Sequence, residues 1–161
     1  FAIEASLLFL IAYFVTTIGA FGVVSIMSRS DQDHDCDQLA DYEGLFWSRP
    51  LLAAFFSAML LSLAGIPLTL GFIGKFYIVA AGVEMGLWSL LAAVVIGSGI
   101  GLFYYLRIIF GMTKKVEREE VIEIPKVSGW ALGVVTLILV VLGVYPTPVI
   151  DWVTQVAATV N

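Results

Sequence analysis

One lysine lies inside a long apolar segment, and its position suits it to proton chemistry. The stretch LSLAGIPLTLGFIGKFY, residues 61–77, contains Lys75 as its single charge, within a run over 51–83 that has no other charged residue. An ammonium at hydrocarbon depth costs about 3 kcal/mol on insertion scales, and such residues mark proton or ion paths that face the protein interior. The alternative is a lysine that snorkels to the headgroups. Lys75 lies about 12 Å of helix inside position 83, which is further than its stem usually reaches.

Helix-breaking residues come just before this lysine. Gly65, Pro67, Gly71 and Gly74 all lie within the ten positions that precede or adjoin it. Proline lacks an amide hydrogen and disfavours helix at the residue before it, and glycine permits non-helical backbone angles. A simple proline kink is one interpretation. The other is a discontinuous helix, broken near 65–71, whose freed backbone groups mark a hydrated cavity near the middle of the membrane.

The composition places these residues in a membrane. The chain has 161 residues, of which 60% are apolar and 13% are charged. Soluble domains have about 45–50% apolar and about 25% charged residues. Four apolar runs are long enough to cross a bilayer, which takes about 20 residues. We therefore predict an all-α integral membrane protein with four transmembrane helices, over 5–28, 51–83, 86–110 and 127–148, the second of them discontinuous, followed by an interfacial tail over 149–161.

The basic residues predict the orientation. Seven of the eight lie in or beside two connections that share one side if all four runs span: Arg29, Arg49, Arg107, Lys114, Lys115, Arg118 and Lys126. The opposite side, with both termini, has none. Basic loops face the cytoplasm, so we expect both ends of this chain on the periplasmic side. The net charge of −5 argues against a nucleic-acid partner.

Three other motifs favour simpler interpretations. DQDHDCD, residues 31–37, resembles an acidic ligand set but lacks the glycine and glutamate of a calcium loop, so a solvated loop is expected and no metal site. GSGIG, residues 97–101, has the small-residue spacing of tight helix packing. An aromatic belt with an anchoring arginine is the favoured interpretation of Tyr104, Tyr105 and Arg107.

The broken-helix motif also resembles a known family. LSLAGIPLTLGFIGKFY is similar to the motif of the antiporter-like membrane subunits of proton-pumping NADH:quinone oxidoreductase, respiratory complex I. GAFGVVSIMS, DYEGLFWSRP, IGSGIGLFYYLRI and LGVYPTP agree with the same family, so the resemblance covers nearly the whole chain. It implies the C-terminal part of an inverted-repeat bundle, with earlier spans in a longer chain. The first residue, Phe1, agrees with a fragment.

The resemblance implies a role for Lys75 and a set of partners. In the family, the terminal broken helix carries a lysine or glutamate that ends a chain of buried ionisable groups, and Lys75 holds that position. The implied function is proton conduction by a multi-pass protein of the bacterial plasma membrane, with other membrane-arm subunits as partners. FMN, iron–sulfur clusters, NADH and quinone belong to other subunits, so no cofactor is expected here.

Two further hypotheses remain open at this point. One is a subunit of a multisubunit cation/proton antiporter, which would be a transporter without redox partners. The other is a passive scaffold span in which Lys75 forms a structural ion pair, with Glu84 or Glu4 as its partner. The residues that would separate the first two hypotheses belong to the expected preceding spans.

The orientation can be tested at the single cysteine of this sequence, Cys36. It lies in the first connection, which the basic residues assign to the cytoplasm. In intact cells, a membrane-impermeant maleimide should leave Cys36 unlabelled, whereas inverted vesicles should label it, with Cys36→Ser as the control. Labelling of intact cells would reverse the proposed topology.

Overall fold

The computed structural model describes residues 1–30, 38–115 and 126–159, and its regular elements there are helices. In chain order they are α1 (Ala2–Ser30), the short 3-10 helix η1 (Leu39–Tyr42), α2 (Leu45–Ser48), α3 (Pro50–Ala64), α4 (Leu70–Glu84), α5 (Trp88–Thr113), α6 (Lys126–Val144) and α7 (Thr147–Ala158). The predicted all-helical class is thus confirmed.

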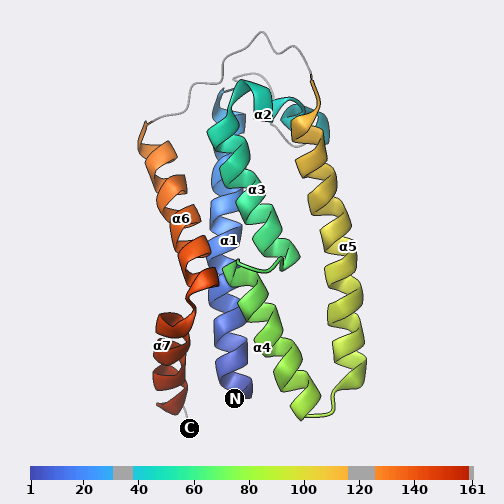
Figure 1. Ribbon diagram of the computed structural model, residues 1–161, viewed down its shortest axis with the longest axis vertical. Helices are drawn as coiled ribbons and strands as arrows, with labels where there is room; N and C mark the ends of the chain where they lie inside the picture. The colour runs from blue at the N-terminus through green and yellow to red at the C-terminus, as the bar shows by residue number, and fades with distance from the viewer. Residues whose placement is uncertain (31–37, 116–125, 160–161) are drawn as a thin grey trace.

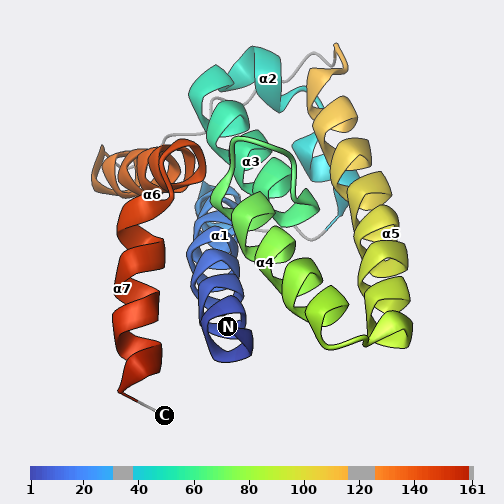
Figure 2. The same cartoon turned by 60° about the horizontal axis from the view of Figure 1, so that its bottom comes forward.

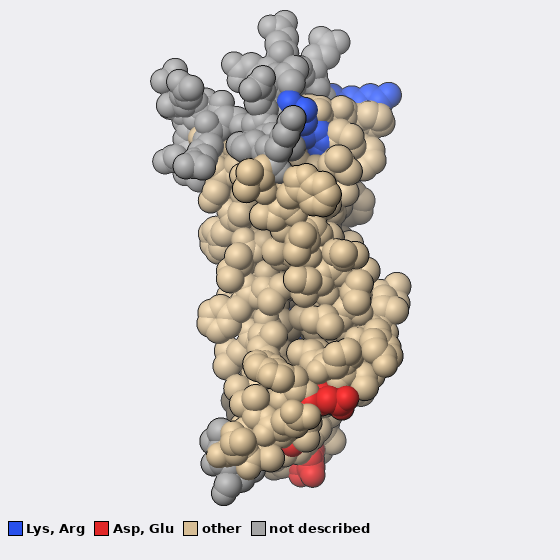
Figure 3. All heavy atoms as spheres, turned by 90° about the vertical axis from the view of Figure 1, so that its left-hand side faces the viewer, with Lys and Arg blue, Asp and Glu red and all other residues tan. Residues whose placement is uncertain are grey.

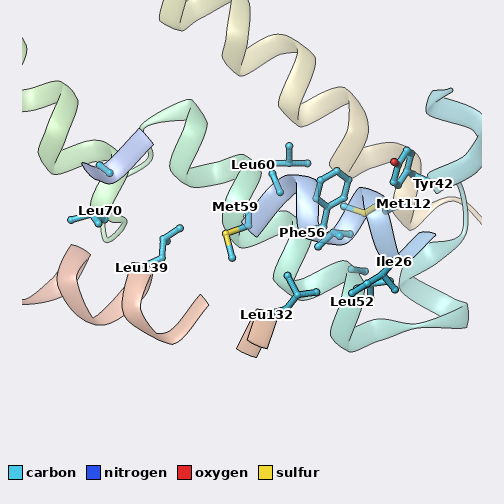
Figure 4. Packing of buried hydrophobic residues seen from close by; sticks show 14 of the residues in the cluster. Ile26, Tyr42, Leu52, Phe56, Met59, Leu60, Leu70, Met112, Leu132 and Leu139 are labelled. Carbon is cyan, nitrogen blue, oxygen red and sulfur yellow. The ribbon is translucent and has the colours of Figure 1, made fainter. Parts of the chain in front are cut away.

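Helix α1 lies at the centre, and α3, α4, α6 and α7 pack around it (Figure 1). Its buried residues recur at helical spacing and include Leu8, Ala12 and Val23. The main apolar cluster joins α1 to α3, α5 and α6, where Met59, Phe56 and Leu132 meet (Figure 4). Lipid tails are as apolar as these side chains, so hydrophobicity alone does not drive the helices to associate in a membrane. The close fit between the buried side chains supplies the stabilising contacts instead.

The second apolar run forms two helices in place of one. Helices α3 and α4 have 15 residues each and are separated by residues 65–69. Neither half spans a bilayer, since a crossing takes about 20 residues, and only together do they run the length of α1 (Figure 1). Among the described residues, three helices are long and apolar enough to cross alone, namely α1, α5 and α6.

The fourth apolar run is also divided, which the sequence had not suggested. The expected helix over 127–148 ends at Val144, and α7 starts at Thr147 after Pro146. Helix α7 lies along the first half of α1 and buries Val149, Val153 and Ala157 (Figure 2). The residues expected as a tail over 149–161 therefore form, as far as the structure describes them, a helix with one packed face.

The breaks in the two divided helices lie against each other. A Cβ atom at Gly143, near the end of α6, would approach within 2.5 Å of the Leu68 carbonyl oxygen and of Thr69 Cα, so glycine lets α6 touch the linker between α3 and α4. Leu139 on α6 and Leu70 on α4 are both fully buried beside this contact (Figure 4). Leu68 itself has φ 75°, the left-handed region that a leucine rarely adopts.

Helix α5 packs loosely, in contrast to the expectation drawn from GSGIG. Met112 is its one buried residue. Cβ atoms added at Gly97 and Gly99 would meet nothing within 4 Å in the described part of the chain, so the prediction of tight packing is not met there. The small residues instead leave space between α5 and α4.

Charge is segregated along the helix bundle. On the face with α6 and α7, lysine and arginine gather at the end where α5 terminates, acidic residues lie at the other end, and an uncharged band separates them (Figure 3). At the basic end, Lys114 pairs with Glu43, and the Trp47 ring nitrogen donates to the Thr113 carbonyl at 2.9 Å. This distribution fits a bundle that crosses a bilayer.

The contact between the two divided helices predicts an asymmetry between two glycine substitutions. Gly143→Ala forces a methyl group against rigid backbone and should destabilise the protein by about 1–3 kcal/mol. Gly97→Ala adds the same methyl group in open space and should be neutral or slightly stabilising, because alanine is the better helix former. Thermal unfolding in detergent measures both variants, and equal melting temperatures would contradict the packing.

Candidate functional site

Lys75 reaches back across the helix break. Its Nζ atom donates a hydrogen bond to the Leu63 carbonyl oxygen at 2.8 Å and another to the Ala64 carbonyl oxygen at 3.1 Å. Both acceptors belong to the last turn of α3, whereas Lys75 belongs to α4. The ammonium thus caps one half-helix from the other.

The last four carbonyl groups of α3 are all satisfied. Gly65, at φ 81°, lets the chain turn so that the Ile66 amide donates to Leu61 at 3.0 Å and the Gly65 amide donates to Ser62 at 2.9 Å. The remaining two carbonyls are those of Leu63 and Ala64. In a continuous helix the amide of residue 67 would bond Leu63, but Pro67 has none. Lys75 provides the missing donor, and its charge complements the negative end of the α3 dipole.

At the start of α4, hydroxyl oxygens accept hydrogen bonds from two backbone amides. Thr69 is the N-cap, and its Oγ1 accepts from the Phe72 amide at 3.4 Å. The next free donor, the Gly71 amide, bonds the Ser62 Oγ atom of α3 at 3.1 Å. A side chain at Gly71 would collide with the Ser62 backbone, so glycine permits this approach. Ser62 also lies 3.1 Å from the Thr16 hydroxyl on α1.

A cavity of about 340 Å³ adjoins the lysine and opens between α1, α4 and α5. Polar side chains from these helices and from α3 line part of it: Tyr13, Thr16, Ser62, Lys75, Ser98 and Tyr105. Its volume has room for several water molecules, and the polar groups in its wall could serve as their hydrogen-bond partners. Gly97 and Gly101 of the GSGIG motif line the opposite wall, which explains the space left by α5.

The structure brings the sequence-predicted residues together at one place. Gly65 and Pro67 lie in the break, Gly71 lies in the first turn of α4, and Gly74 packs against the α1 backbone near Phe9. Thr16 and Ser62 were missed, because hydroxyl residues in apolar runs are common and nothing local pairs them. Tyr105, interpreted as part of an aromatic belt, lines the cavity.

Other candidates do not join this site. The acidic motif over 31–37 lies outside the described residues. Within 1–30, 38–115 and 126–159 there is no group of three histidine, cysteine, aspartate or glutamate side chains that could hold a metal ion. Glu84 and Glu4, proposed as ion-pair partners in the scaffold hypothesis, are not bonded to Lys75, whose described partners are the two carbonyls.

Comparison with known proteins assigns the family. Residues 1–101 match the family described as "NADH:quinone oxidoreductase/Mrp antiporter, TM". The chain belongs to this family. It is 50% identical over 162 residues to the NADH-quinone oxidoreductase subunit N of Chromohalobacter salexigens and 47% identical over 161 residues to that of Ectopseudomonas mendocina, matches that include 94% and 97% of this chain.

A solved structure agrees with these relatives. A chain of respiratory complex I from Thermus thermophilus with bound aureothin superposes with a TM-score of 0.81 at 28% identity, covering 92% of this chain and 34% of that one. The present chain spans 33% of the length of each of the two curated relatives. The resemblance stated from the GFIGKF motif is thereby confirmed at the level of the family.

Close contact between Gly65 and Lys75 can be measured as a coupling energy. A Cβ atom at Gly65 would lie 2.8 Å from Lys75 Cδ, so Gly65→Ala adds a collision to the cost of its left-handed backbone, whereas Gly86→Ala (φ 67°, nothing within 4 Å) adds backbone strain alone. In a double-mutant cycle with Lys75→Ala, Gly65→Ala should show about 0.5–3 kcal/mol of coupling and Gly86→Ala about none. Additive unfolding energies for both pairs would contradict the observed contact.

Proposed function

We propose that this chain is part of an antiporter-like subunit in the membrane arm of respiratory complex I, and that it conducts protons through Lys75. The observation that carries the proposal is an ionisable amine at the centre of a divided membrane helix, held by two backbone carbonyls and open to a cavity. The names of the relatives at 47–50% identity favour complex I over the cation/proton antiporter branch of the same family.

The partners of Lys75 suit a relay better than a scaffold. A carboxylate partner would hold the lysine permanently charged, because separating a buried ion pair costs several kcal/mol. Carbonyl oxygens stabilise the ammonium without carrying a full charge themselves, so a proton can leave without stranding an opposite charge. The adjoining cavity offers room for the water that receives it.

The proposal includes orientation and cofactors. The N-terminus of the chain and the end of α7 face the periplasm of a bacterial plasma membrane, and the basic end of the bundle faces the cytoplasm. Lys75 then lies on the half-helix nearer the periplasm and serves as the terminal group of the path. Electron transfer, with FMN, iron–sulfur clusters and quinone, takes place in other subunits.

Replacement of Lys75 tests the relay in the full-length protein of the assembled complex. Lys75→Met removes the titratable group and should lower proton translocation at least about tenfold, since positioned proton-transfer groups contribute about 10²–10⁴ in rate. Lys75→Arg keeps the charge but binds its proton too tightly to release it, and should be similarly impaired. Proton uptake by inverted vesicles during NADH oxidation, normalised to assembled complex, measures both.

Lys114→Met is the matched control, because it removes an exposed lysine at the basic end of the bundle. It should translocate protons like the wild type. Normal translocation by assembled Lys75→Met would favour the scaffold hypothesis, under which an apolar replacement is neutral or stabilising.

A further inference from the structure

The buried serine and threonine residues in the part of the chain that the structure describes all lie at the helix break. Thr16 and Ser62 are each 1% exposed and Thr69 is 8% exposed, and they are the buried polar side chains among the residues that the structure describes. Thr69 caps α4 locally. Thr16 and Ser62 instead connect three helices, α1, α3 and α4, around the same point.

The direction of these hydrogen bonds follows from their donors. Thr16 Oγ1 lies 2.7 Å from the Ala12 carbonyl oxygen, which can only accept, so the Thr16 hydroxyl hydrogen is used there. The Ser62 hydroxyl must then donate to Thr16 Oγ1, 3.1 Å away, and its lone pairs accept from the Gly71 amide at 3.1 Å. The series of hydrogen bonds therefore runs from the Gly71 amide through the Ser62 and Thr16 hydroxyls to the Ala12 carbonyl.

Two different links thus join α3 to α4 across the break. The first is the Lys75 ammonium on the Leu63 and Ala64 carbonyls, and it weakens when the amine loses its proton, because charged donors form about twice as strong a hydrogen bond as neutral ones. The second is the Ser62 hydroxyl on the Gly71 amide, and it contains no group that titrates in the physiological range.

We propose that Ser62 and Thr16 are positioning residues for Lys75. They hold the first turn of α4 against the last turn of α3 and fasten both to α1, so that the Leu63 and Ala64 carbonyls stay within reach while the amine is neutral. Reprotonation then restores the same geometry in every cycle. This inference rests on the proposed proton-conducting function and adds to it a support that does not titrate.

Isosteric substitutions test the hydroxyl groups in the full-length, assembled complex. Thr16→Val removes the acceptor for Ser62 with little change of shape, and Ser62→Ala leaves the half-buried Gly71 amide without its partner. Both should assemble but translocate protons roughly tenfold more slowly, the size expected for one lost buried hydrogen bond. Thr16→Ser keeps the hydroxyl and should restore translocation.

Thr136→Val is the matched control. Thr136 is half-buried in α6 and its hydroxyl donates to the Leu132 carbonyl at 2.8 Å, the same local bond that Thr16 makes, away from the break. It should behave as the wild type. Wild-type translocation by Thr16→Val and Ser62→Ala would overturn the proposal, as would a Thr16→Ser variant as impaired as Thr16→Val, or a loss of assembly that accounts for the whole defect.

The outcome is distinguishable from failure of the proposed function. If Lys75→Met is impaired while Thr16→Val and Ser62→Ala are normal, the relay stands and the positioning role falls. If Lys75→Met translocates normally, the relay itself falls, whatever the hydroxyl variants do.

Discussion

The structure depends on one constraint, that every backbone amide and carbonyl at hydrocarbon depth needs a partner within the protein or in trapped water. A break at residues 65–69 frees some of these groups locally, and specific residues then provide partners for several of them. Gly65 allows two carbonyls to be satisfied by the turn, Lys75 satisfies two more, and Ser62 satisfies the Gly71 amide. The half-buried Lys75 is thus part of the backbone hydrogen bonding as well as a candidate relay.

The break and the lysine were predictable because their signals are local. Glycine, proline and a lone charge within about ten positions identify a divided helix whatever surrounds it. The Thr16–Ser62 contact joins residues 46 positions apart and follows from how α1 packs on α3, which no periodicity in these apolar runs reveals. Within the described residues GSGIG lines the cavity, since small residues allow close packing but equally leave room for a cavity.

The second divided helix contacts the break in the first one. The end of α6 touches the linker at Leu68 and Thr69, and Leu68 holds a left-handed backbone that costs of order 1–3 kcal/mol. Such strain persists only where the surrounding structure maintains it, and Gly143 on α6 packs directly against this linker. This second break was not predicted, because LGVYPTP places its prolines where a membrane helix would end in any case. The end of α6 therefore packs directly on the linker.

The two carbonyl partners of Lys75 also determine how its protonation responds to a change of charge elsewhere in the protein. A second unit charge about 10 Å away, at an effective dielectric constant of about 20, changes the energy of the ammonium by about 1.7 kcal/mol, which exceeds a tenfold change in its protonation equilibrium. A carboxylate beside the lysine would add several kcal/mol to the cost of losing the proton, so a shift of this size would leave the amine protonated. Two neutral carbonyls add no such counter-charge, so the same shift is large enough to change the protonation state of the amine. A site built in this way can respond to protonation of another buried group without any contact between them.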